Sequence, residues 1–504
     1  MLAALIAALL ALSEVLIITR APGPGLDPDS ASYLGSAESL AHGNGLTIPM
    51  AEWYDDEPTS PLSHFPPGLP IALATTIKLG FAPTQGARVV NALAQAVTVG
   101  IVTYMVATTG GIFAGVVVAI AVLVGRPFVL ASLAVLSEPL FLALLSLALW
   151  GMIFRWPAAL VGLVAALAAL VRYAGISLLA AVALWQLMNG GSIGRRIKNV
   201  GLSVVPTIVL FGAWVIHTRV ERGPTAIRQF GIYGGIGQDF LQGIQTIGGW
   251  LSPTTDDSPH GPLWAWLAAL SGLLALVVLI GGVRRARRDS TGGRRLFRAA
   301  GMIAGCYVVV LIASRLLADP GIPFDERILV PLILLATLAI VLAGALAWPH
   351  WGLLLRGIIG GALLAWVIAA SSASLDEATW AVTNGSDFAG EDWRTSEVLA
   401  WVRRNAPNTP LYSNWPAAIY FHVHRPAWLL PPPGTGASEW RAFADTLARR
   451  HGIVVAFDAP SPDVAPPDSI AAAGHLHAIA RLHDGILYGP AQQGTSPAPG
   501  TNAP

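Results

Sequence analysis

Long apolar segments recur along most of this 504-residue chain, and they limit its fold more strictly than any other feature. About twenty consecutive apolar residues allow a helix to cross the hydrocarbon core of a bilayer, and shorter segments can cross where a bundle buries them. Hydropathy predicts about thirteen spans, approximately at 2–19, 67–81, 86–107, 111–125, 127–137, 139–154, 157–171, 173–188, 200–218, 262–282, 299–317, 327–346 and 351–371. The chain is therefore predicted to be mainly α, a polytopic transmembrane helical bundle.

The composition supports this prediction and excludes several other classes of protein. Hydrophobic residues make up 54% of the chain and charged residues 12%, with a mean hydropathy of +0.61, which is more apolar surface than a soluble core of this size could bury. The formal net charge of +1 provides no long-range field that would attract nucleic acid. Cys306 is the only cysteine, which excludes an intrachain disulfide, and no Cys/His cluster has zinc spacing.

The positions of basic residues predict which side of the membrane each loop faces. Residues 1–19 lack the basic start and the cleavage site of a signal peptide, so we interpret them as an uncleaved first span. Lys and Arg are concentrated in the loops around 195–198 and 284–298, which should be cytoplasmic. Counting spans from these loops puts the N-terminus inside and the C-terminal region outside. The same count assigns to the outer face Asp27, Asp29, Glu138, Arg172, the loop 219–261 and Arg327.

Two polar regions divide the chain into domains. A long first outer loop, 20–66, interrupts a transmembrane domain over 1–372. From 373 to 490 the hydropathy falls and soluble periodicities appear, which indicates a small extracytoplasmic α/β domain. Its helices and strands are predicted over 393–405, 439–450, 410–413 and 452–457. Residues 491–504 are rich in Pro, Gly, Ser and Thr, which is typical of a disordered tail.

Two aspartates, Asp27 and Asp29, follow the first span directly and form a candidate site. Asp29 precedes a helix predicted over 30–40, so one interpretation is an N-cap whose carboxylate accepts bonds from free backbone N–H groups. Capping needs only one carboxylate, so it does not account for Asp27. A second carboxylate beside the membrane loses hydration, and this cost must be offset by another interaction. Metal ligation and general base catalysis are the other interpretations.

Three more charged side chains stand at the predicted outer ends of apolar spans. Glu138 begins a span, where the helix dipole would stabilise a carboxylate. Its role is therefore either structural or functional, and the sequence leaves both interpretations open. Arg172 interrupts an apolar stretch, and its guanidinium could extend to the interface or bind a phosphate in bidentate fashion. Arg327 follows Asp325 and Glu326, either of which could pair with it. Because both arginines share a face with the acids, phosphate binding is the favoured interpretation.

Taken together, these elements resemble a known group of membrane enzymes. They are the acidic run Asp27-Pro28-Asp29-Ser30 with Tyr33, the loop return Phe65–Pro70, Ser137–Pro139, Arg172–Gly175 and Asp325–Pro331. In this order they look like the GT-C superfamily of polytopic glycosyltransferases, in particular bacterial relatives of the protein O-mannosyltransferases and the lipid A aminoarabinose transferases. The likeness covers about the first 345 residues, by order and topology more than by any single motif.

The resemblance implies an enzyme of a bacterial-type inner membrane that transfers a sugar, with inversion, from a polyprenyl-phosphate carrier on the extracytoplasmic side. An aspartate of the first outer loop would act as general base on the acceptor hydroxyl. That role falls on Asp29 or Asp27, and Asp29 is preferred because it keeps the spacing to Tyr33. Glu138 would orient the acceptor or a basic group, and Arg172 and Arg327 would hold the lipid phosphate. The acceptor would be a lipid, a glycan or a protein.

Some positions depart from the family pattern. Asp55 and Asp56, later in the same loop, are an adjacent acidic pair that could replace the first one as part of a substrate loop. Ile328 stands where an aromatic residue is expected after Arg327. His64 adds a ligand that a divalent metal would accept together with the first-loop aspartates, but nothing in this spacing requires a metal, and no cofactor is expected.

Other classes of function remain as alternatives. A polytopic transporter of a lipid-linked or small substrate would place its charges near the bilayer midplane and show an internal repeat, whereas these charges cluster at one edge. A lipid-linked glycan polymerase or ligase would differ mainly in acceptor, and a non-catalytic envelope assembly protein would use the C-terminal domain for binding. Trp393 and Trp415 in that domain could stack on a sugar ring, but packing is the favoured interpretation.

Overall fold

The computed structural model describes residues 1–189, 191–222, 231–254, 262–289, 291–319, 321–461, 464 and 476–490. The chain forms two compact units. The first, here called the helical unit, contains Met1–Gly25 and Leu62–Ser386. The second, here called the sheet unit, contains Leu26–Pro61 and the chain from Asp387 onward. The predicted tail over 491–504 lies outside the described residues.

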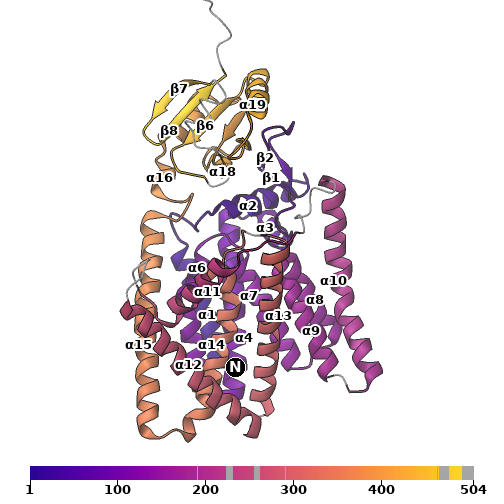
Figure 1. The fold of residues 1–504 in the computed structure, drawn as a ribbon, viewed down its shortest axis with the longest axis vertical. Helices are drawn as coiled ribbons and strands as arrows, with labels where there is room; N and C mark the ends of the chain where they lie inside the picture. Colours follow the sequence, from indigo (N-terminus) through magenta and orange to yellow (C-terminus); the bar gives the residue numbers. More distant parts are fainter. Residues whose placement is uncertain are drawn as a thin grey trace, which may run out of the picture. The chain divides into compact units, whose positions relative to one another are not determined.

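The helical unit is a bundle of α-helices that run alongside one another (Figure 1). They are α1 (Leu2–Ile18), α3 (Gly68–Lys78), α4 (Pro83–Gly110), α5 (Ile112–Leu123), α6 (Arg126–Leu133), α7 (Glu138–Ile153), α8 (Ala158–Val171), α9 (Ile176–Asn189), α10 (Ile193–Arg222), α11 (Gly237–Leu251), α12 (Pro262–Asp289), α13 (Thr291–Leu317), α14 (Glu326–Ala347) and α15 (Leu353–Asn384). The 3-10 turns η1 (Tyr173–Gly175) and η3 (Trp348–His350) follow α8 and α14. Each segment predicted from hydropathy coincides with one of these helices.

Helix length separates clear membrane spans from shorter helices. Among the described residues, six helices are long and apolar enough to cross a membrane, namely α4, α10, α12, α13, α14 and α15. Helices α5 and α6 are bent by 53° at a short break and would add a seventh as one broken span. Helices α1, α7, α8 and α9 are apolar but shorter. The chain has the helices of a multi-pass membrane protein, whereas the count of thirteen crossings and the sidedness derived from it stay predictions.

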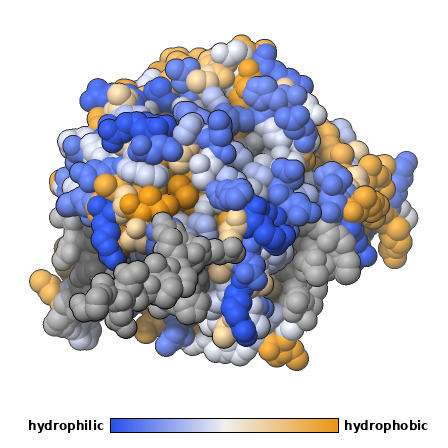
Figure 2. Space-filling model, turned by 90° about the horizontal axis from the view of Figure 1, so that it is seen from above, coloured by the Kyte–Doolittle hydropathy of each residue, from blue (hydrophilic) through white to orange (hydrophobic). Residues whose placement is uncertain are grey.

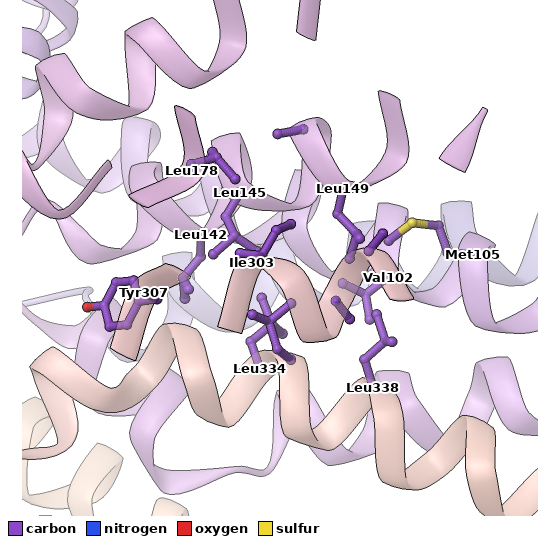
Figure 3. Close-up of a cluster of buried hydrophobic side chains, with 14 of the residues drawn as sticks. Val102, Met105, Leu142, Leu145, Leu149, Leu178, Ile303, Tyr307, Leu334 and Leu338 are labelled. Carbon is purple, nitrogen blue, oxygen red and sulfur yellow. The ribbon is translucent and has the colours of Figure 1, made fainter. Parts of the chain in front are cut away.

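Burial distinguishes central helices from peripheral ones within this unit. In the apolar windows of α4 and α14, 56% of the residues are buried, compared with 11% in α12 and 6% in α15. Figure 3 shows the centre, where Leu142, Leu145 and Leu149 of α7 meet side chains of α4, α13 and α14. The apolar side chains that α12 and α15 expose suit contact with lipid. The face of the molecule shown in Figure 2 is mainly hydrophilic.

Small residues let several of these helices approach one another closely. A Cβ added at Gly162 of α8 would lie 2.2 Å from the Ser203 carbonyl oxygen of α10. A Cβ at Gly282 of α12 would lie 2.2 Å from the Ala343 Cα of α14. Membrane helices gain packing where small side chains allow backbone contact, because lipid supplies no hydrophobic force between them.

Gly68 makes a third close approach, at the start of α3. Here an added Cβ would lie 2.6 Å from the Leu170 carbonyl oxygen and 2.8 Å from Val171 Cγ2, in the last turn of α8. The predicted return of the first loop into the membrane through prolines and Gly68 therefore packs against the end of α8. Arg172 is the next residue after that helix.

The sheet unit is a six-stranded sheet with helices. Its order is β2-β5-β4-β6-β8-β7, with parallel pairing from β2 to β6 and antiparallel pairing from β6 to β7. The strands are β2 (Met50–Ala51), β4 (Leu411–Ser413), β5 (Ala427–Leu429), β6 (Ile453–Phe457), β7 (His477–Leu482) and β8 (Gly485–Gly489), and β1 (Thr47–Ile48) pairs separately with β3 (Ser60–Pro61). The helices are α2 (Pro28–Ala41), α16 (Glu391–Arg394), α17 (Glu397–Asn405), α18 (Pro416–Val423) and α19 (Ala437–Arg449).

The first loop belongs to this sheet unit. Strand β2 of the loop pairs in parallel with β5, and the Tyr420 hydroxyl of α18 donates to the Glu38 carboxylate of α2. Trp428 Nε1 also donates to the Asp55 carbonyl at 2.9 Å. The sequence analysis assigned 20–66 to the transmembrane domain and began the soluble domain at 373, but 26–61 cluster with the C-terminal residues and α15 continues to Asn384.

Short backbone bridges accompany the chain where it passes between units. In the helical unit, Gly25 pairs with Ala134, and its carbonyl accepts from Val135 N at 3.0 Å. In the sheet unit, the next residue, Leu26, pairs with Asp387. The first loop therefore leaves the helical unit from beside the segment that leads to Glu138.

We predict that Gly68→Ala lowers the free energy of unfolding by about 1–3 kcal/mol, because the added methyl group must displace the backbone of α8. Thermal unfolding of the purified protein measures the effect. Gly357→Ala in α15 is the matched control, since its Cβ meets nothing within 4 Å and alanine favours a helix. Equal melting temperatures for the two variants would contradict this account of Gly68.

Candidate active site

A buried carboxylate shared by two arginines is the main feature of the candidate site. Glu138 is 1% exposed and occupies the first turn of α7. Its Oε1 lies 2.6 Å from Arg172 Nη1 and 3.1 Å from Arg327 Nε. The sequence analysis predicted all three on one face, and the structure brings them into direct contact. The cluster unites the start of α7, the end of α8 and the start of α14.

Two cationic side chains are held together in this cluster. Arg172 and Arg327 converge on the Glu138 carboxylate, Arg172 Nη1 also donates to Ser137 Oγ at 3.0 Å, and the Asp325 carboxyl lies close enough to act on both guanidinium groups. The Arg172 side chain is 15% exposed and that of Arg327 is 35% exposed, so Arg327 is the more accessible cation. A fixed, partly accessible pair of guanidinium groups suits an anion such as a phosphate.

The N-terminus of α14 is fixed by its own capping group. Asp325 is the N-cap, and its Oδ1 accepts from Ile328 N at 2.9 Å. Burial raises the pKa of the Asp325 carboxyl, while the bond from Ile328 N–H and the nearby Arg327 guanidinium oppose that rise. The cap sets the direction in which the first turn presents Arg327.

Tyr307 is a member of this neighbourhood that the sequence analysis missed. Its side chain is buried in α13, and its hydroxyl donates to the Ile328 carbonyl at 2.7 Å. It lies close enough to Glu138, Arg172 and Asp325 to interact with them electrostatically. A single tyrosine within a predicted apolar span was the available signal, but hydropathy alone does not show what it faces.

A second ionic group lies on the same helix as Arg327. Glu326 Oε1 accepts from Arg126 Nη1 at 3.1 Å, and Arg126 also contacts Glu377 of α15 at 2.5 Å. The sequence analysis allowed Glu326 to pair with Arg327; the structure pairs Glu326 with Arg126, and Arg327 with Glu138. Neighbouring residues at the start of a helix point in different directions, which explains the separate partners.

The first-loop aspartates begin α2 in the sheet unit. Asp27 is the N-cap, because its Oδ1 accepts from Asp29 N at 3.0 Å, and the helix starts at Pro28. The N-cap interpretation of Asp29 is therefore wrong, and the helix begins two residues earlier than predicted. Asp29 is a half-buried residue of the first turn. Tyr33 lies one turn later and is 3% exposed.

The alternative acids Asp55 and Asp56 also lie in the sheet unit. Asp55 Oδ2 accepts from Glu52 N at 3.1 Å, which closes a local turn. The Asp56 side chain is fully exposed and lies 3.5 Å from Arg450 Nη2. His64, in the helical unit, is exposed and packs edge-on against Phe65, with ring centroids 4.7 Å apart.

The tryptophans considered for sugar stacking pack within the sheet unit. The Trp393 ring lies 4.9 Å from that of Phe388 and 5.1 Å from that of Phe457. Trp415 packs 5.5 Å from Phe388, and its Nε1 donates to the Ala459 carbonyl. Within the described ranges, no group of three or more His, Cys, Asp or Glu side chains is arranged to hold a metal ion.

Several solved membrane enzymes share this fold. ArnT from Cupriavidus metallidurans, solved with undecaprenyl phosphate, matches with a TM-score of 0.57 at 14% identity, covering 97% of each chain. The arabinofuranosyltransferase AftD from mycobacteria matches with a TM-score of 0.57 at 15% identity, over 96% of this chain and 39% of AftD. The chain has the fold of the GT-C glycosyltransferases.

A third neighbour extends the GT-C comparison to an archaeal enzyme. The oligosaccharyltransferase AglB from Archaeoglobus fulgidus, solved with an inhibitory peptide and a dolichol-phosphate, matches with a TM-score of 0.51 at 13% identity. The match covers 90% of this chain and 69% of AglB. No protein-family model and no curated protein matches the sequence. The GT-C fold is thus recognised from the structure, because the sequence identity to these enzymes is only 13–15%.

We predict that Glu138→Gln lowers the free energy of unfolding by about 3–5 kcal/mol, because it leaves two guanidinium groups facing each other without the buried carboxylate. Thermal unfolding measures the loss. Glu377→Gln is the control, since that carboxylate is a quarter exposed and solvent screens its pair with Arg126. A loss at Glu138 no larger than at Glu377 would show that the cluster does not stabilise the bundle.

Proposed function

We propose that this protein is a membrane glycosyltransferase that moves a sugar from a polyprenyl-phosphate donor to an acceptor hydroxyl on the extracytoplasmic face, with inversion. The observation that carries the proposal is the contact of Arg172 and Arg327 with one buried carboxylate. The GT-C fold supports it. So do the undecaprenyl phosphate in the ArnT structure and the dolichol-phosphate and peptide in the AglB structure.

The arginine cluster suits the phosphate of such a donor. When the bond from the anomeric carbon to the phosphate oxygen breaks, negative charge grows on the leaving phosphate. Preorganised cations stabilise that charge and lower the barrier. Glu138 would hold the two guanidinium groups in place and offset part of their charge, so that the site attracts the donor without retaining the product too strongly.

We assign the general base to Asp29. Asp27 already accepts the Asp29 N–H as the cap of α2, so its carboxylate has a structural task. The resemblance to the GT-C enzymes likewise assigns the base to an aspartate of the first loop, and Asp29 keeps the spacing to Tyr33.

The proposed reaction is a single displacement. Asp29 accepts the proton of the acceptor hydroxyl as its oxygen forms a bond with the anomeric carbon. The bond from that carbon to the phosphate oxygen breaks on the opposite side, and the polyprenyl phosphate leaves. One displacement inverts the configuration at the anomeric carbon. No divalent metal is needed for these steps, so chelation should leave the rate unchanged.

We predict that Asp29→Asn lowers the rate of sugar transfer by about 10²–10⁴-fold, because it removes the general base. Asp27→Asn should instead lower stability by about 0.5–2 kcal/mol through the weakened cap and affect the rate less. The assay offers the purified protein a panel of polyprenyl-phosphate sugars and acceptors. Asp56→Asn is the matched control, since that carboxylate is fully exposed. Unchanged transfer by Asp29→Asn would refute the assignment of the base.

We predict that Arg172→Gln and Arg327→Gln each weaken binding of polyprenyl phosphate by at least about tenfold, the effect of losing one charge-assisted hydrogen bond. Titration with sugar-free undecaprenyl phosphate measures the affinity. Arg126→Gln serves as control, because Arg126 pairs with Glu326 and Glu377 instead of Glu138. Equal losses in all three variants would indicate a general effect on the bundle and contradict a phosphate site at Glu138.

A further inference from the structure

Arg315 is a buried arginine with donors that the structure does not use. It belongs to α13, is 7% exposed, and places Nη2 at 2.7 Å from Asp239 Oδ2 of α11. Its Nε and Nη1 are buried without a hydrogen-bond partner among the described residues, and Asp239 Oδ2 likewise lacks a well-aligned donor. Buried polar groups are normally hydrogen-bonded, and ionisable groups at membrane depth are candidates for function.

The pair lies on the same helix face as the phosphate-binding neighbourhood. Tyr307, Leu311 and Arg315 follow one another at intervals of four residues along the buried stripe of α13. Tyr307 contacts the Ile328 carbonyl beside Arg327. Eight residues of helix separate Tyr307 from Arg315, a distance of about 12 Å along the axis. Arg315 is therefore two turns beyond the cluster around Glu138.

Helix α11, which carries Asp239, is held next to the start of α14. Gln242 Oε1 accepts from Phe324 N at 3.1 Å, and Thr246 Oγ1 donates to the Phe324 carbonyl at 2.9 Å. Asp239, Gln242 and Thr246 are spaced to share one face of the helix. Phe324 directly precedes Asp325, the cap of α14. Helix α11, which carries Asp239, is thus bonded to the segment that presents Arg327.

The unused atoms define the kind of ligand. Arg315 and Asp239 together form a pair of one cation and one anion, without net charge. Arg315 needs acceptors and Asp239 needs a donor, so a phosphate, which supplies only acceptors when ionised, would satisfy only half of the pair. A hydroxyl group both donates and accepts. Neighbouring hydroxyl groups of a sugar would satisfy both side chains at once.

We infer that Arg315 and Asp239 bind hydroxyl groups of the donor sugar, at the end of the site opposite the lipid phosphate. This inference rests on the proposed function. With the phosphate at Arg172 and Arg327, the attached sugar would extend toward the pair along α13. A site that pairs buried polar groups with substrate hydroxyls discriminates strongly against sugars that lack them, because the groups are then left unpaired. The pair would therefore select the sugar.

Entry of the sugar would involve the glycine-rich segment that is bonded to the end of α13 next to Arg315. The segment 231–237 runs into the start of α11 and contains four glycines. It is joined to α13 by bonds from Gly231 N to the Leu317 carbonyl at 3.0 Å and from Tyr233 N to the Leu316 carbonyl at 2.8 Å. Glycines lower the barrier to rearranging such a segment.

The test compares binding of two probes to the full-length protein in lipid nanodiscs. One probe is undecaprenyl phosphate without a sugar, and the other is a panel of undecaprenyl phosphates that carry a hexose or a pentose. Arg315→Gln and Asp239→Asn should each weaken binding of the accepted sugar-bearing donor by about tenfold or more, the effect of losing a charged hydrogen bond. Binding of the sugar-free probe should change less than about twofold. Arg295→Gln, at the other end of α13, is the control, since its Nη1 donates to the Ile153 carbonyl.

A purely structural ion pair would give a different result. In that case both probes would lose affinity equally, in step with the melting temperature, and the inference would be overturned. If single variants fail to fold, the double variant Arg315→Met with Asp239→Leu replaces the pair by apolar groups, a change that buried ion pairs often tolerate. It should keep the affinity for the sugar-free probe and lose the preference for the sugar.

Donors that lack one hydroxyl group of the sugar test directly whether that hydroxyl contacts Arg315 and Asp239. Removing the hydroxyl that contacts the pair should weaken wild-type binding and leave Arg315→Gln unaffected. If wild type transfers sugar but its preference survives both substitutions, this inference alone fails. If wild type neither binds nor transfers from any donor of the panel, the proposed function fails and this inference falls with it.

Discussion

The burial of one carboxylate between two guanidinium groups is the interaction on which the arrangement of the helical unit depends. Glu138 is almost fully removed from water, and an isolated charge there would be strongly destabilising. Its stability requires Arg172 and Arg327 within ion-pair distance. Because these side chains belong to three helix ends, α7, α8 and α14 must meet at one level. The close packing of Gly68 against α8 and the Asp325 cap of α14 both serve this meeting.

The sequence predicted these three charged residues because charge is rare in apolar helices. Interruptions at Glu138, Arg172 and Arg327 are visible without a structure, and span counting placed them on one face. Their pairing was not predictable, because Glu326 is adjacent to Arg327 in sequence yet contacts Arg126. Arg315 falls near the end of a predicted span, where a basic residue is ordinarily explained by the interface. Only its burial and its contact with Asp239 distinguish it.

Hydropathy predicted where helices form better than how the chain is divided. Mean hydropathy over a window depends only on composition. It therefore does not distinguish short buried helices such as α7 and α8 from long membrane spans. The sheet unit was harder to predict, because β2 contains only two residues and pairs with β5 more than 370 residues later. Local periodicity carries no information about a partner so distant in sequence. The wrong cap of α2 has a local cause: Pro28 fits the first position of a helix, so the helix begins before Asp29 and Asp27 becomes the cap.

The membership of the first loop in the sheet unit has a consequence for how such a protein can change. Strand β2 and helix α2 obtain their partners from β5 and α18, so the loop that carries Asp29 and the C-terminal residues form one folded body from two separate stretches of the gene. A recombination event that exchanged only the C-terminal stretch would separate α2 from its support. A new C-terminal domain would therefore have to be acquired together with a compatible first loop, as a matched pair.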